Sequence, residues 1–257
     1  MHKCRKKPRV LNESEANKRI PWRTKNQRTK RLYYCCLAIE ERTYAIPRRL
    51  HSSELLEIPD DFGVDKIRKL IGRMDEVAEK LPELFEGDNG VILFKITKTK
   101  QFLNGGGSLI SVPEDDAREV VQEGASLSVL INFEARFLHE MCHVWRADFD
   151  DMSETVPMLA QVLYDPKDNE IGNKTYQRIG ANTISELQGG NGEGRYTLDW
   201  INTMKIMLKV REMLEMGFRV PKSDLELVRL TTETIEFFKT VPWEIRKGII
   251  IQHVLAR

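Results

Sequence analysis

Residues 126–146 form the segment that most restricts how this chain can fold. Apolar side chains recur through it at the three- and four-residue spacing of a helix with one broad buried face. They are Leu127, Leu130, Phe133, Phe137, Leu138, Met141 and Trp145. The same segment carries His139 and His143, which a helix places one turn apart on the same side. Two imidazoles so arranged can bind a single metal ion, and Glu140 between them can reach a water on that metal.

The five residues that end with His143 read His-Glu-Met-Cys-His, which is the H-E-x-x-H pattern. In this motif and the elements around it, about residues 90–165, the chain resembles the zincin metallopeptidases. The resemblance implies an α+β fold in which a small mixed sheet with an edge strand accompanies an active-site helix. It also implies zinc as the cofactor, a peptide or protein as the substrate, and Glu140 as the catalytic residue.

A catalytic zinc usually has three protein ligands and a water, so a third ligand must come from outside the motif. Position 149, six residues after His143, is Phe149, and no later histidine occurs before His253. A carboxylate is therefore expected, and Glu154 is the first candidate because its helix can pack antiparallel to the helix of the histidines. A helix-borne Glu followed by Ala160 resembles the gluzincins. Glu154 also has a structural interpretation, because an acid in the first turn stabilises the helix dipole.

Other acidic residues remain alternative third ligands. The nearer ones are Asp148, Asp150 and Asp151, and the distant ones are Glu186 and Glu193. A zinc hydrolase also needs a donor that stabilises the oxyanion of the reaction. The candidates for that donor are Tyr176, Arg195, Tyr196 and His253. Cys142 is expected to be a small buried side chain, because it lies about 100° around the helix from His143.

The residues before the metal helix predict the sheet. Residues 91–97 are rich in β-forming side chains, and residues 108–112 form a second short strand; residues 33–39 are a weaker candidate. In zincins an edge strand shortly before the metal-bearing helix pairs with an extended substrate, and residues 104–112 resemble that strand. A sheet edge can bind a peptide in this way through its main-chain hydrogen bonds. The alternative interpretation is a hairpin loop with no role in substrate binding.

Helical patterns cover much of the remaining chain. They predict helices at residues 64–81, 114–123, 154–164, 175–187, 196–215, 223–239 and 242–255. Ser153 is the expected N-cap of the helix at 154, and Ser223 to Glu226 form a capping box. The chain is therefore predicted to contain a basic arm (1–31), a zincin-like α+β core (32–165) and a helical C-terminal part (166–257) that packs on the core.

The formal net charge of +1 conceals an asymmetry along the chain. Residues 1–31 hold twelve Lys or Arg against two Glu, whereas the remainder holds 28 basic and 37 acidic side chains. The arm is expected to be a disordered, solubilising tail because it has few apolar residues. An alternative is weak, salt-dependent contact with nucleic acid or an anionic surface. For the whole chain, the alternative to an enzyme is then a non-catalytic protein that binds nucleic acid or an acidic partner through this arm.

Composition and cysteine placement favour a cytoplasmic protein. Hydrophobic residues make up 41% and charged residues 31% of the chain, which fits a soluble globular protein. No apolar run approaches the length of a membrane span. The cysteines are not spaced as a disulfide framework, and reduced thiols are usual in the cytoplasm. They are Cys4, Cys35, Cys36 and Cys142.

Overall fold

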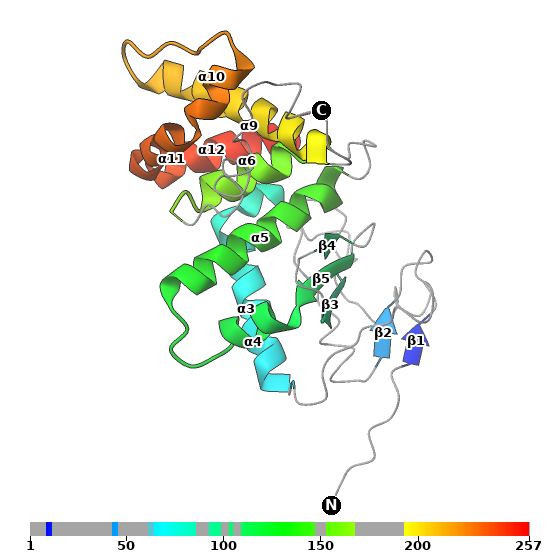
Figure 1. The fold of residues 1–257 in the computed structure, drawn as a ribbon. Coiled ribbons are helices and arrows are strands. Elements are labelled where there is room, and N and C mark those ends of the chain that lie inside the picture. Colours follow the sequence, from blue (N-terminus) through cyan, green and yellow to red (C-terminus); the bar gives the residue numbers. More distant parts are fainter. Residues whose placement is uncertain are drawn as a thin grey trace, which may run out of the picture. The chain divides into compact units, whose positions relative to one another are not determined.

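The computed structural model describes residues 9–11, 43–45, 62, 64–85, 93–98, 103–104, 109–146, 153–167 and 193–256. These residues are mostly helical, and the chain divides into two compact units, residues 1–140 and 141–257. The division falls inside one continuous helix, α5 (Leu127–Arg146), which Figure 1 shows in green. The strand predicted at residues 33–39 and the helix predicted at 175–187 lie outside the described residues.

The first unit contains a small mixed sheet. β3 (Leu93–Thr97) runs parallel to β5 (Leu109–Pro113), and β4 (Leu103–Asn104) runs antiparallel to β5. β3 and β5 correspond to the strands predicted at residues 91–97 and 108–112. The apolar side chains Phe94 and Ile96 of β3 and Ile110 and Val112 of β5 are buried. Ser111 of β5 is buried as well, at 4% exposure.

β5 is the middle strand of this sheet, which corrects the prediction that residues 104–112 form an edge strand. Ile110 and Ser111 pair with β3 on one side, and with Asn104 and Leu103 on the other. A peptide cannot add to a strand that has neighbours on both sides. The two described strands of this stretch, β4 and β5, pair antiparallel, as in the hairpin alternative. Among the described strands, β4 takes the edge position beside β5.

A second pair of strands lies near the N-terminus of the chain. β1 (Arg9–Leu11) pairs in parallel with β2 (Thr43–Ala45), with Val10 opposite Tyr44. β1 belongs to the segment predicted as a basic arm. The other residues of that arm lie outside the described part of the chain.

Helix α3 (Val64–Lys80) confirms the helix predicted from residue 64. Its apolar stripe is buried as expected at Leu70, Met74 and Val77, and Leu81 directly after the helix is buried too. Pro82 ends the α-helix because it has no backbone N–H to donate. The chain continues through a 3₁₀ turn, η3 (Pro82–Leu84), and after β5 through α4 (Glu114–Val120).

A buried carboxylate connects α3 to α5 within the first unit. Glu134 of α5 is only 1% exposed, and its Oε2 accepts a hydrogen bond from Lys80 Nζ at 2.6 Å. Glu76, one turn before Lys80, also hydrogen-bonds to Glu134. Burial, together with this hydrogen bond and the charge of Glu134, raises the pKa of Glu76 above its ordinary value.

The second unit confirms the predicted helical C-terminal part. Helix α6 (Thr155–Tyr164) packs against α9 (Glu193–Leu214) and α12 (Trp243–Leu255). Helices α10 (Asp224–Arg229) and α11 (Thr231–Thr240) also pack against α9, and Figure 1 shows them in orange to red. The most deeply buried side chains of this unit include Leu163, Trp200, Met204, Met207, Leu208, Phe238 and Ile250.

The helix predicted over residues 223–239 is broken at Leu230, where ψ is 4° and the backbone leaves the helical region. The chain re-enters a helix at Thr231, whose hydroxyl accepts a hydrogen bond from Trp200 Nε1 at 3.3 Å. The apolar spacing alone favours one continuous helix over residues 223–239. The structure instead has a break directly before Thr231, which makes this buried hydrogen bond to α9. Ser223 is the N-cap as predicted, but its side chain makes no capping hydrogen bond.

Helix α12 holds the C-terminal end of α6. Arg246 donates hydrogen bonds to the carbonyl oxygens of Leu163 and Tyr164. Carbonyl groups in the last turn of a helix have no N–H partner within the helix. The rings of Tyr164 and Trp243 meet edge to face, with their centroids 5.5 Å apart. The end of α6 is therefore fixed by both polar and aromatic contacts.

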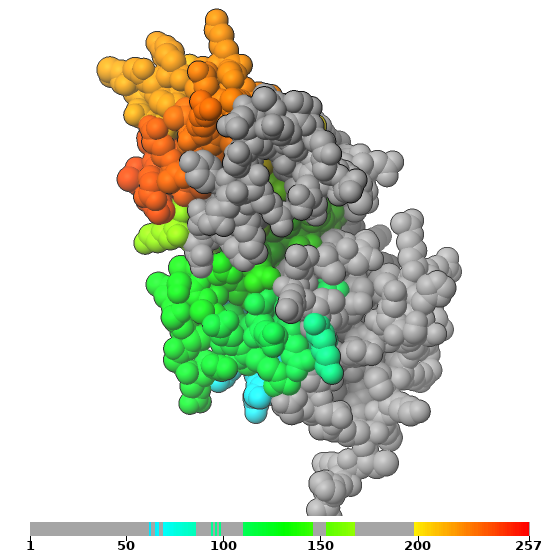
Figure 2. Space-filling model, in the orientation of Figure 1, coloured from blue at the N-terminus to red at the C-terminus, as the bar shows by residue number. Residues whose placement is uncertain are grey.

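Some apolar side chains lie at the surface. Leu127, which was predicted on the buried face of α5, is 71% exposed in the first turn of that helix, where a single exposed leucine is common. Met213, Leu214 and Met216 are exposed where α9 ends. Figure 2 shows the segment that contains this helix end in gold. None of the described helices has both the length and the apolar character needed to cross a membrane.

Replacing Lys80 by Met should destabilise the protein by about 1–3 kcal/mol, because the buried Glu134 carboxylate loses its ammonium partner. The Lys80 side chain is 41% exposed, so solvent screening keeps the effect below that of a fully buried pair. Urea unfolding measures the change. Lys69→Met on the exposed side of α3 is the control and should change stability by less than about 0.5 kcal/mol. Equal stability of the two variants would contradict this role of Lys80.

The raised pKa of Glu76 predicts a pH dependence of stability. A carboxyl whose pKa is higher in the folded state stabilises the fold when protonated, and this contribution is lost as pH rises through the folded pKa. Glu76→Gln should therefore raise the Tm at pH 7, and the gain should vanish below the unfolded pKa of about 4.3. The ion pair lost with Arg73 is partly exposed and contributes little. A lower Tm for Glu76→Gln than for the native chain at pH 7 contradicts the prediction.

Candidate metal centre

Helix α5 carries His139 and His143 on successive turns of one continuous helix, as the sequence predicts. The Nδ1 atom of His139 is buried, and the side chain of His143 is 19% exposed. The apolar side chains of Leu138 and Met141, on the same helix, are at most 1% exposed. Glu140 is 8% exposed. The helix therefore holds both imidazoles and the carboxylate of the motif in largely buried surroundings.

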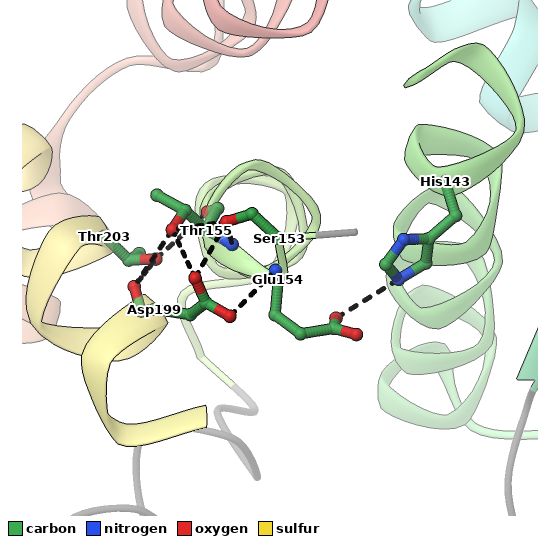
Figure 3. Close-up of polar contacts among 6 residues, drawn as sticks. All are labelled: His143, Ser153, Glu154, Thr155, Asp199 and Thr203. Atoms are coloured by element: carbon green, nitrogen blue, oxygen red, sulfur yellow. Dashed lines mark hydrogen bonds and ion pairs between the residues drawn. The ribbon is translucent and has the colours of Figure 1, made fainter. Parts of the chain in front are cut away.

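Glu154 comes to His143 from a different helix. It directly precedes α6, and Figure 3 shows its side chain extended towards His143. His143 Nε2 and Glu154 Oε2 are 3.1 Å apart, and the Glu154 side chain is 17% exposed. The residue predicted first among the candidate carboxylates therefore lies beside a histidine of the motif.

His139, His143 and Glu154 form a group that can hold a metal ion. Each offers one ligand atom, and these atoms all lie within 4.8 Å of one another. A tetrahedral zinc with bonds of about 2.0–2.1 Å holds its ligand atoms about 3.3 Å apart. The 3.1 Å between His143 and Glu154 is close to that value. Two imidazole nitrogens and one carboxylate oxygen are also a donor set used by catalytic zinc.

The start of α6 differs from the prediction by one residue. Glu154 is the N-cap, and its side chain makes no capping hydrogen bond because it turns towards His143. Ser153, which was predicted as the N-cap, precedes it and accepts a hydrogen bond from the Thr155 N–H at 3.1 Å. The carboxylate of Glu154 thus points away from the helix start that the dipole interpretation assigned to it.

Of the other predicted site residues, the structure describes His253 and Cys142, and neither belongs to this group. His253 lies in α12, where its Nδ1 bonds to the carbonyl oxygen of Ile249 at 2.9 Å. Cys142 is fully buried, as predicted. The remaining candidates, or their side chains, lie outside the described part of the chain: Asp148, Asp150, Asp151, Tyr176, Glu186, Glu193, Arg195 and Tyr196.

The sequence did not point to Asp199, which the structure brings to the start of α6. Asp199 belongs to α9, is 6% exposed, and hydrogen-bonds to the three consecutive residues 153–155 (Figure 3). One available signal was an acid directly before Trp200 and Ile201 in a predicted helix. That pattern could not show that its partners lie about 45 positions earlier in the chain.

Comparisons with known protein families, with curated proteins and with solved structures return no match for this chain. The resemblance to zincins therefore stays a prediction from the motif. The inference of function rests on the residues of the site and on the motif that supplies two of them.

Replacing His143 or Glu154 by Ala should each weaken zinc binding by more than about 100-fold. Loss of an outer partner alone weakens metal binding by about 10–100-fold, and loss of a ligand should exceed that. Titration against a competing chelator measures the affinity. Cys142→Ala is the control on the same helix and should keep the native affinity. An unchanged affinity in Glu154→Ala would remove Glu154 from the ligand set.

Proposed function

We propose that this protein is a zinc-dependent metallopeptidase, with His139, His143 and Glu154 as ligands and Glu140 as the catalytic base. One observation carries the proposal: Glu154, from a separate helix, lies 3.1 Å from a histidine of the H-E-x-x-H motif. Two histidines and a glutamate are a ligand set of catalytic zinc sites, which keep one position open for water or substrate.

When bound, zinc supplies Lewis acidity, which lowers the pKa of a coordinated water to about 7 and polarises a carbonyl group. Glu140 precedes His143 by three residues, a spacing at which two side chains are neighbours on the surface of a helix. Its carboxylate takes a proton from the attacking water and passes it to the nitrogen of the leaving amine. The new C–O bond forms first, the C–N bond breaks once the nitrogen is protonated, and the products are a carboxylic acid and an amine.

A peptide or protein is the proposed substrate because the Glu of this motif serves amide hydrolysis in the metallopeptidases that the chain resembles. An extended substrate would add to the sheet at its outer strand. Of the described strands, β3 and β4 are the outer ones, and β4 lies in the stretch that resembles the substrate-binding strand of zincins. We therefore propose that the main chain of Leu103 and Asn104 makes these contacts.

Glu140→Gln tests the mechanism, because Gln has nearly the same size but cannot take up the proton. We expect it to keep about one zinc per chain while hydrolysis of an unfolded protein such as casein falls by about 10²–10⁴-fold. His139→Ala should lose both zinc and hydrolysis. Undiminished hydrolysis in Glu140→Gln would overturn the assignment of Glu140 as the base.

A second candidate is a non-catalytic interaction protein, which is favoured by the twelve basic and two acidic side chains of residues 1–31. Under this alternative the purified chain carries no metal, and deleting residues 1–31 removes salt-sensitive binding to duplex DNA. Under the metallopeptidase proposal the chain carries about one zinc, and the deletion leaves that zinc in place. Metal analysis of the two proteins separates the candidates.

A further inference from the structure

Helix α6 begins in an unusual way. The N-cap side chain of a helix commonly accepts a hydrogen bond from a backbone N–H of the first turn. Glu154 occupies this position but makes no such bond, because its carboxylate reaches towards His143 instead. Ser153 instead accepts the hydrogen bond from the Thr155 N–H, and other groups must hold the backbone of Glu154 if its carboxylate is to serve the metal centre.

Asp199 of α9 holds the backbone of Glu154. Its Oδ2 accepts a hydrogen bond from the backbone N–H of Glu154 at 3.1 Å. Its Oδ1 accepts hydrogen bonds from the hydroxyl groups of Ser153 at 2.8 Å and Thr155 at 3.0 Å. One buried carboxylate thus binds Ser153, the backbone of Glu154 and Thr155. A carboxylate at the positive end of a helix also has favourable electrostatics.

Thr203 strengthens this attachment one turn further along α9. Its hydroxyl lies 3.0 Å from the carbonyl oxygen of Thr155 and 2.9 Å from the carbonyl oxygen of Asp199. Figure 3 shows Asp199 and Thr203 gathered around the start of α6, while the Glu154 side chain leaves in the direction of His143. The backbone is therefore held on one side of Glu154 and the carboxylate is presented on the other.

From this arrangement we infer that Asp199 is a positioning residue of the metal centre, which fixes the backbone of Glu154 so that its carboxylate stays beside His143. The inference rests on the proposed function in one respect, the use of Glu154 as a ligand. Glutamate is a long side chain with several rotatable bonds, and an anchored backbone reduces the freedom that it loses on binding a metal. Asp199 acts through Glu154 and does not itself belong to the ligand group.

Zinc titration of the full chain against a competing chelator tests this role. Asp199→Asn replaces one acceptor oxygen by an NH₂ group, so the three donors can no longer all be satisfied. We expect zinc affinity to fall by about 10–100-fold, as for other residues that orient a ligand. Thr231→Val is the matched control, because it removes the buried hydrogen bond of the adjacent Trp200, which belongs to a different helix contact. Its zinc affinity should stay within about twofold of the native value.

A double-mutant cycle distinguishes positioning from a general loss of stability. If Asp199 acts through Glu154, Asp199→Asn should change the affinity of the Glu154→Ala protein by less than about twofold. An equal loss in the presence and absence of Glu154 would overturn the inference, and so would native affinity in Asp199→Asn. If Asp199→Asn does not fold, Ser153→Ala and Thr155→Val carry the same cycle, each removing one donor to Asp199. A native chain that binds no zinc would instead overturn the proposed function itself.

Discussion

A carboxylate withdrawn from water must be matched by hydrogen-bond donors or by a cation, and two such groups organise the described helices. Glu134 on α5 holds Lys80 of α3, and Asp199 on α9 holds the start of α6. In each case the acid lies on one helix and its partner on another. Apolar packing alone would let these helices slide, whereas directional hydrogen bonds fix one arrangement. The helix of the two histidines and the helix that begins beside Glu154 are both held in this way.

Local periodicity was enough to predict the parts of the site that lie on one helix. The spacing of His139 and His143 determines their common side wherever the segment is helical. Glu154 could be predicted because the neighbouring sequence offers no third histidine. A helix that begins soon after the motif can also bring a carboxylate back to the two histidines. The buried stripe of α3 and the end of that helix at Pro82 followed from similarly local rules.

Contacts between distant segments could not be predicted in the same way. Whether β5 is an edge or a middle strand depends on both of its neighbours, and residues 104–112 alone do not specify them. The break at Leu230 accompanies a hydrogen bond between Trp200 and Thr231. The spacing of apolar residues along one helix cannot predict such a bond. The role of Asp199 could not be predicted either, because one acidic residue in an apolar helix does not indicate which groups donate hydrogen bonds to it.

The two ends of α6 depend on parts of the chain that are made much later. The backbone bond that holds Glu154 joins residues 45 positions apart, and Arg246 bonds to a carbonyl 83 positions before it. A growing chain leaves the ribosome from its N-terminus. All three side chains of the candidate centre therefore emerge before the helices that anchor α6. We therefore expect the centre to be completed only after α9 and α12 have been synthesised and have packed against α6.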